Sequence, residues 1–169
     1  MVDHSRRQLF RGRVTAVTPQ QRMPWQVDEA HFIDHCSRCE ACIQACPEQI
    51  VVKGDGGFPT LDFQRGECTF CQACVSACPQ PVFRPVTEPA WQQSAALKAG
   101  CLAEQGVMCR GCQDSCEPEA IVFPPRRAAI SQPEIHTDLC TGCGACVSVC
   151  PSNAIAITAL EQEVRDERS

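Results

Sequence analysis

The stretch CSRCEACIQACP, residues 36–47, decides the fold of this chain. Its four cysteines follow the spacing C-x2-C-x2-C-x3-C, and a proline ends the run. The same pattern returns without deviation in CTFCQACVSACP at residues 68–79 and in CTGCGACVSVCP at residues 140–151. Three thiolates so close in sequence can converge on one face of an inorganic cube, and this spacing is a ligand set for a [4Fe-4S] cluster. We therefore expect a fold built around iron-sulfur clusters.

The fourth cysteine of such a run has a different task from the first three. In the bacterial two-cluster arrangement it ligates the partner cluster, so that runs act in reciprocal pairs. The proline after it fixes φ and removes a donor where the chain turns away. We expect the first run to pair with the second and the third with the fourth. A nested scheme, in which the first pairs with the fourth and the second with the third, uses the same ligands and remains open.

A further group at residues 101–116 is irregular. It keeps the last two gaps of the pattern but stretches the first gap to seven residues and places Glu117 before Pro118. We expect four [4Fe-4S] clusters, or three if this group is incomplete. A site without Cys101 would hold a [3Fe-4S] cluster or a labile cube with an open iron. The candidate cofactor-binding and iron-binding residues are all sixteen cysteines: Cys36, Cys39, Cys42, Cys46, Cys68, Cys71, Cys74, Cys78, Cys101, Cys109, Cys112, Cys116, Cys140, Cys143, Cys146 and Cys150.

Two other uses of cysteine fit the spacing less well. Disulfide scaffolds are usually secreted and shorter than about 80 residues, and the arginine-rich start of this chain lacks the apolar run of an export signal. Structural zinc sites usually draw two cysteines from each of two separated knuckles. A third cysteine two residues beyond each C-x2-C favours a cube.

Composition and charge limit the remaining possibilities. Tyrosine is absent and the aromatic fraction is 5%, so clusters would have to stabilise small modules in place of a large core. Residues 1–25 carry five arginines against one acid, a net charge of +4, which leaves −9 on the rest. An acidic body argues against a nucleic-acid partner, whereas the basic arm either docks on an acidic protein surface or is simply solvated. No stretch approaches the roughly 20 apolar residues of a membrane span.

The segments between the runs predict an α+β fold of two tandem ferredoxin-like modules. Residues 50–63 and 120–136 each read as a short hairpin, because β-branched runs flank Gly-rich or Pro-rich turns. A helical turn should begin near the third cysteine of each run. Residues 91–98 favour a linker helix that Gly100 ends. The predicted units are a basic arm (1–25), module 1 (26–86), a helical linker (87–100), module 2 (101–158) and a charged tail (159–169).

Several stretches together resemble the NapF family, the ferredoxin-type accessory proteins of the periplasmic nitrate reductase system. The most discriminating of them is the irregular group, which ends in CQDSCEP. The stretches that carry the resemblance are Ser5-Arg6-Arg7, Met23-Pro24-Trp25, His31-Phe32 through Cys39, and Cys109 through Pro118. The Arg6-Arg7 pair also resembles a twin-arginine export motif, but no apolar stretch follows it, so we expect the chain to stay in the cytoplasm.

The resemblance implies a cytoplasmic protein that contacts the catalytic subunit of periplasmic nitrate reductase and assists its maturation before export. The residues alone leave two other roles open, a general electron-transfer polyferredoxin and a binding module whose clusters only hold the fold. The sequence contains no Gly-rich phosphate loop and no nucleophile motif. We therefore expect an electron-transfer or accessory protein and not an enzyme.

Overall fold

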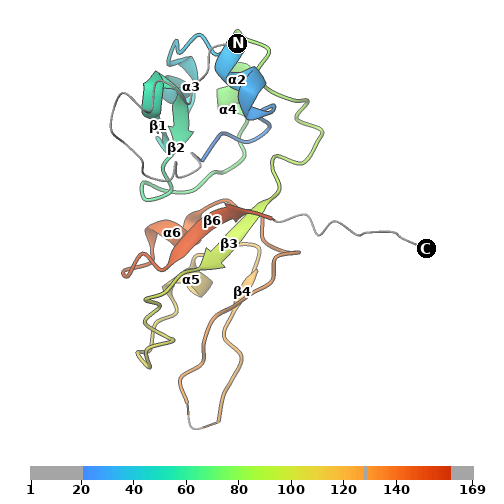
Figure 1. Cartoon of the computed structure of the whole chain (residues 1–169). Helices are drawn as coiled ribbons and strands as arrows, with labels where there is room; N and C mark the ends of the chain where they lie inside the picture. The colour runs from blue at the N-terminus through green and yellow to red at the C-terminus, as the bar shows by residue number, and fades with distance from the viewer. Residues whose placement is uncertain (1–20, 128, 161–169) are drawn as a thin grey trace, which may run out of the picture.

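The computed structural model of the chain describes residues 21–127 and 129–160. Most of the predicted basic arm and of the charged tail therefore lies outside the described residues. The described part forms two halves that follow one another along the chain (Figure 1). The first half holds α2 (Glu29–His35), α3 (Ala41–Ala45), β1 (Val51–Lys53), the 3₁₀ turn η1 (Asp55–Gly57), β2 (Pro59–Leu61) and α4 (Ala73–Ser76). The second half holds β3 (Gln93–Leu97), α5 (Gly111–Asp114), β4 (Ile121–Val122), β5 (Glu134–Ile135), α6 (Ala145–Ser148) and β6 (Ile155–Ala159).

Four short helices follow the cysteine pattern. α3, α4, α5 and α6 each begin one residue before the third cysteine of their group, as the sequence predicts. In the three regular runs the residue before the helix is left-handed: Glu40, Gln72 and Gly144 have φ of 65°, 63° and 88°. A single helical turn is marginal in isolation. These turns pack in pairs, α3 against α4 and α5 against α6, so that each half joins two runs.

Both predicted hairpins are confirmed. β1 pairs antiparallel with β2 in the register Val51↔Leu61, and β4 pairs antiparallel with β5 in the register Ile121↔Ile135. In the first hairpin the turn passes through Gly56 at a φ of +66°, a conformation that glycine adopts without strain. Each hairpin joins the two cysteine groups of its half along the chain.

The predicted linker helix is wrong. Residues 93–97 form β3, which pairs antiparallel with β6 from Gln93↔Ala159 to Leu97↔Ile155. The local sequence favours a helix, but one this short is marginal without tertiary support. Pairing with the Ile- and Thr-bearing β6 buries Gln93, Ser94 and Ala95, and this tertiary context overrides the local preference. Residues 93–97 are thus part of the second half, whereas the other unit boundaries stay predictions.

The first half has a shorter counterpart of the β3–β6 pair. Gln26 forms an isolated antiparallel bridge with Phe83, the Val27 N–H donates to the Val82 carbonyl at 3.1 Å, and the Arg84 N–H donates to the Trp25 carbonyl at 2.6 Å. In each half, then, the chain before the first cysteine group lies against the chain after the second. The two halves repeat one small mixed α/β plan, which is a ferredoxin-type fold.

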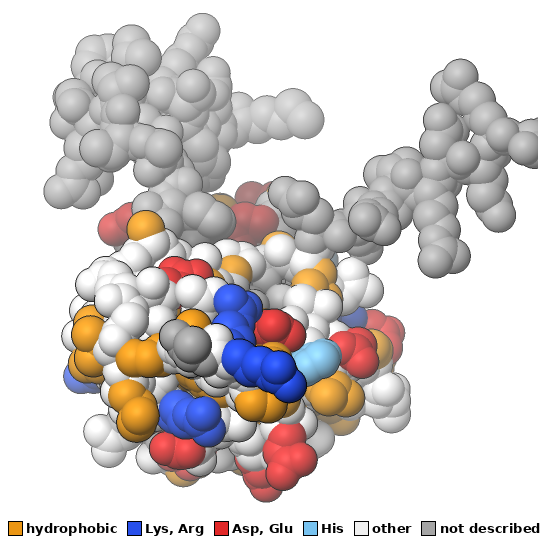
Figure 2. All heavy atoms as spheres, turned by 90° about the horizontal axis from the view of Figure 1, so that it is seen from below, with side chains coloured by type: hydrophobic (Ala, Val, Ile, Leu, Met, Phe, Trp, Pro, Cys, Tyr) orange, Lys and Arg blue, Asp and Glu red, His pale blue; other side chains and the backbone are white. Residues whose placement is uncertain are grey.

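The hydrophobic core is small and includes some of the cysteines. Its largest fully buried side chains are Phe32, Ile50 and Val82, all in the first half. The second half contributes Phe123 and otherwise smaller residues, and it leaves hydrophobic side chains in solvent, among them Met108 at 82% exposure. Figure 2 looks onto the lower end of the molecule of Figure 1, where hydrophobic, basic and acidic side chains are interspersed. Among the described residues, no helix is long and apolar enough to cross a membrane.

Candidate iron-sulfur sites

The sixteen cysteines line four separate hollows, four to each. Every hollow takes three cysteines from one group and one from its partner group. The first group pairs with the second and the third with the fourth, in sequential and not nested order. We number the hollows: site I has Cys36, Cys39, Cys42 and Cys78; site II has Cys46, Cys68, Cys71 and Cys74; site III has Cys116, Cys140, Cys143 and Cys146; site IV has Cys101, Cys109, Cys112 and Cys150.

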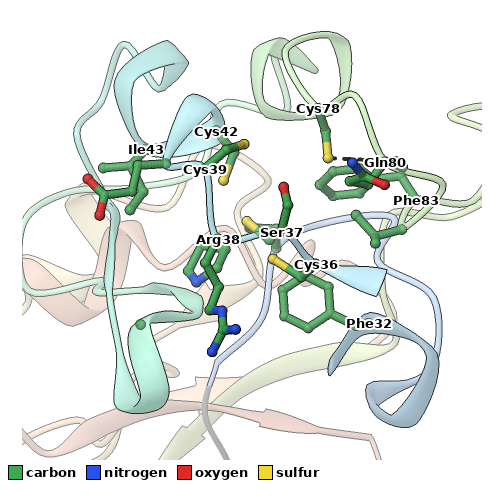
Figure 3. A pocket seen from close by; sticks show the side chains of 15 residues that line it. Phe32, Cys36, Ser37, Arg38, Cys39, Cys42, Ile43, Cys78, Gln80 and Phe83 are labelled. Carbon is green, nitrogen blue, oxygen red and sulfur yellow. Dashed lines mark hydrogen bonds between the residues drawn. The ribbon is translucent and has the colours of Figure 1, made fainter. Parts of the chain in front are cut away.

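Site I shows how one of these hollows is built. The sulfur atoms of Cys36, Cys39 and Cys42, from the first cysteine group, lie on one side of the hollow. The sulfur atom of Cys78, from the second group, faces them (Figure 3). Cys42 stands on α3, whereas Cys78 follows α4. Packing of α3 against α4 therefore brings the fourth ligand to a site that one run alone could not complete.

The irregular group also reaches its site. Cys101 lines site IV together with Cys109, so the seven residues between them loop outward and return. Within the loop the Gln105 N–H donates to the Cys101 carbonyl at 3.2 Å, and the Val107 N–H donates to the Leu102 carbonyl at 2.9 Å. Ala103 is 2% exposed and anchors this loop, while Met108 points into solvent. The longer gap changes the surface beside site IV but keeps four cysteines around it.

The third cysteine of each group is the buried one: Cys42, Cys74, Cys112 and Cys146. Burial raises the pKa of Cys42 and Cys146 to about 12, and that of Cys74 and Cys112 to about 11. Neighbouring cysteines add to the rise in pKa because several thiolates close together repel one another. Iron takes up the thiolate form, so cluster binding would displace these protons.

Backbone N–H groups point at several of the sulfur atoms. The Ala95 N–H donates to Cys140 Sγ at 3.4 Å, and the Ala154 N–H donates to Cys150 Sγ at 3.2 Å. A hydrogen bond from the Ala41 N–H lowers the pKa of Cys39. Such bonds are among the determinants of a cluster's reduction potential. β3 and the residue before β6 (Ile155–Ala159) thus act on the second half's sulfur atoms directly.

The donor set fits a [4Fe-4S] cube. A cube of this kind is held by four cysteine thiolates, one to each iron, and each of the four sites has that number. A single zinc ion instead needs all its sulfur ligands at about 2.3 Å from one centre. Among residues 21–127 and 129–160, no three His, Cys, Asp or Glu side chains are grouped tightly enough to bind one metal ion. The ligands of a cube lie farther apart because each binds a different iron.

Some residues that matter to the sites were not found from the sequence. Phe70 lines site II, Gly144 lines site III, and Trp91 lies against Phe70 with a ring-centroid distance of 5.4 Å. The Cys68 N–H donates to the Cys143 carbonyl at 2.8 Å, which joins site II to site III. One signal was present: the fourth run reads CTGCGAC, with glycines where the first run has Arg38 and Glu40.

Two family models match the chain. The 4Fe-4S dicluster domain matches residues 35–83, which contain the first two cysteine groups. The 4Fe-4S binding domain matches residues 133–156, which contain the last.

Curated relatives extend the similarity over most of the chain. Ferredoxin-type protein NapF of Escherichia coli (strain K12) is 47% identical over 154 residues, covering 91% of this chain and 94% of that protein. Ferredoxin-type protein NapF of Haemophilus influenzae is 42% identical over 167 residues, covering 93% of this chain and 95% of that protein. Ferredoxin-type protein NapG of Escherichia coli (strain K12) is 30% identical over 160 residues, covering 82% of this chain and 69% of that protein.

Proposed function

The chain belongs to the NapF family of ferredoxin-type iron-sulfur proteins, and from that premise we propose that it assists maturation of the catalytic subunit of periplasmic nitrate reductase. It would do so in the cytoplasm, before that subunit is exported. The observation that carries this proposal is the similarity to NapF of Escherichia coli, at 47% identity over 91% of the chain. The similarity spans both halves of the chain, so the proposed role is assigned to the whole chain and not to one half.

All sixteen cysteines serve as iron ligands in this proposal, and sites I to IV each hold one [4Fe-4S] cluster. The two halves then act as tandem two-cluster modules. When bound, the clusters supply one-electron redox chemistry. The protein's own part is to fix four thiolates in each site, to bury the third cysteine of each group, and to direct N–H groups such as those of Ala95 and Ala154 at sulfur.

We assign the chain an electron-transfer or accessory role and no catalysis of its own. Each proposed site uses its four cysteines as ligands, so that each iron would be fully coordinated by sulfur. A coordination position for a substrate would then be absent. The chain would pass electrons, or the iron and sulfide of a cluster, to a partner protein.

The basic arm is the proposed contact with that partner. Arg6 and Arg7 lie in the part of the chain outside the described residues, and the proposal rests on their charge beside a body of net −9. A double variant, Arg6→Ala with Arg7→Ala, should weaken partner capture without changing the iron content. Unaltered capture would leave the arm as a solvated terminus.

The maturation role is tested by capture and by deletion. Anaerobically prepared chain should retain the metal-free catalytic subunit of periplasmic nitrate reductase and release the fully loaded subunit. Deleting the gene that encodes the chain should lower nitrate reductase activity while the amount of the catalytic subunit stays the same. Full activity in the deletion strain would contradict the proposal.

A general electron-transfer polyferredoxin is the second candidate. The hydrogen bond between Cys68 and Cys143 favours it, because this bond brings a ligand of site II against a ligand of site III. Under this reading, deletion would leave nitrate reductase active and interrupt electron supply to another acceptor. The deletion experiment therefore separates the two candidates.

A further inference from the structure

The two halves meet at a compact junction, formed by Cys68, Phe63 and Phe70 of the first half and Trp91, Cys143 and Gly144 of the second. The Cys68 N–H donates to the Cys143 carbonyl at 2.8 Å. Both partners in this bond are cysteines of a four-cysteine site, one of site II and one of site III. The side chains of Gln21 and Gln93 are also hydrogen-bonded across the two halves.

Trp91 fills the space between the two halves. Its ring meets Phe70 edge-on at 5.4 Å and Phe63 at 6.3 Å between centroids. Its Nε1–H donates to the Thr141 carbonyl at 2.7 Å. Because Phe70 lines site II and Thr141 lines site III, one side chain contacts the walls of both sites.

Gly144 gives the first half room to approach. A Cβ at this position would lie 2.1 Å from Phe63 Cδ1 and 2.5 Å from Phe63 Cγ. Distances this short cannot be accommodated unless the ring and its backbone move away. Any side chain at residue 144 would therefore push the two halves apart at the junction.

Backbone conformation alone does not explain this glycine. Residue 144 is left-handed, with φ +88°, but the equivalent residues of the first two runs, Glu40 and Gln72, are left-handed as well. These two positions carry full side chains at φ of 65° and 63°. The difference at residue 144 is the contact with Phe63. Its glycine is thus a feature of the junction and not of the cysteine motif.

We propose that the junction holds site II against site III, so that the four sites form one series in the order I, II, III, IV. This inference rests on the proposed binding of a cluster at each site. Sites I and II share the α3–α4 pair and sites III and IV share the α5–α6 pair, so the junction supplies the missing middle link. Sites I and IV are then the two ends at which electrons enter and leave.

The series defines what the chain can do with an electron. Transfer between neighbouring sites oxidises one and reduces the next by a single electron, and it needs no other reactant. The junction residues act as positioning residues for this transfer, because they fix the separation of the two middle sites. An external one-electron donor at one end and an acceptor at the other complete the balance.

The test uses the intact, cluster-loaded chain. Gly144→Ala is compared with Gly106→Ala, whose backbone has a similar φ of +80° but whose Cβ would meet nothing within 4 Å. Iron content is measured first, followed by electron paramagnetic resonance of the fully reduced protein. Hydrogen exchange at the Cys68 amide is followed by mass spectrometry. Trp91→Phe, which removes the indole N–H bond to Thr141 and reduces the ring that meets Phe63 and Phe70, serves as a second variant.

The expected result is a loss of the magnetic coupling between the two halves in Gly144→Ala at unchanged iron content, with faster exchange at Cys68. The Gly106→Ala variant should match the wild type. Coupling that persists in Gly144→Ala, or a Cys68 amide that exchanges freely in the wild type, would overturn the proposal. If Gly144→Ala loses iron, the proposal is tested instead by the magnetic coupling in Trp91→Phe and by the exchange rate of the Cys68 amide in the wild type. Low iron in the wild type would instead refute cluster binding, and with it the proposed function.

Discussion

Cys101 completes the cysteine lining of site IV although seven residues separate it from Cys109. The loop between them is held by its own backbone hydrogen bonds and by the buried Ala103. Spacing alone left the role of Cys101 open, because three cysteines remain in site IV without it. In the structure Cys101 lines site IV as Cys36, Cys68 and Cys140 line sites I, II and III.

Replacing Cys101 should affect one site only. Cys101→Ala leaves Cys109, Cys112 and Cys150, so iron should fall from about 16 per chain to between about 12 and 15, as one iron or the whole cube is lost. Met108→Ala, an exposed change in the same loop, should leave iron unchanged. Iron and sulfide analysis checks this, and a Cys101→Ala protein with the full iron content would show that Cys101 is not a ligand.

At the scale of elements, the helices and strands that the sequence predicted are those determined by residues close together in the sequence. The β1–β2 and β4–β5 hairpins followed from β-branched runs and turn residues, and the short helices followed from the cysteine spacing. β3 did not, because its partner β6 lies at the other end of the second half and the local residues favour a helix. The glycines of CTGCGAC mark residue 144 as unusual, but its contact with Phe63 joins two halves whose mutual position is a tertiary property that local sequence does not predict.

β3 should tune the potential of site III through Ala95. Ala95→Pro removes the N–H that donates to Cys140 Sγ, and a lost donor destabilises the reduced, more negative state. One hydrogen bond is worth about 1 kcal/mol, so the site III potential should fall by on the order of 40 mV, at 59 mV per tenfold change for one electron. Ala95→Gly keeps the N–H and is the control. A redox titration followed by electron paramagnetic resonance measures the shift, and equal potentials in the two variants would contradict this role.

At the scale of the whole molecule, the clusters would replace much of the hydrophobic core. Few large side chains are fully buried, and the cysteines Cys42, Cys74, Cys112 and Cys146 are themselves part of the core. Units this small usually need a disulfide or a bound metal to stay folded. Metal binding that occurs only in the folded state contributes its binding free energy to folding.

Removing the clusters should therefore unfold the chain. Chelation of iron under anaerobic, reducing conditions should abolish most of the circular dichroism signal, and reconstitution with iron and sulfide should restore it. Zinc added in place of iron and sulfide is the control, and it should fail to restore the signal because the sites are sized for cubes. A metal-free chain with a near-native spectrum would show that the protein core suffices.

We propose that the sixteen cysteines form four complete [4Fe-4S] sites. Iron and sulfide quantitation on anaerobically purified protein, with electron paramagnetic resonance of the reduced state, tests it most directly. Four complete cubes would give about 16 irons per chain, four for each set of four cysteine ligands, with signals from interacting cubes. A content of about 12 irons, or of zinc in place of iron, would contradict it.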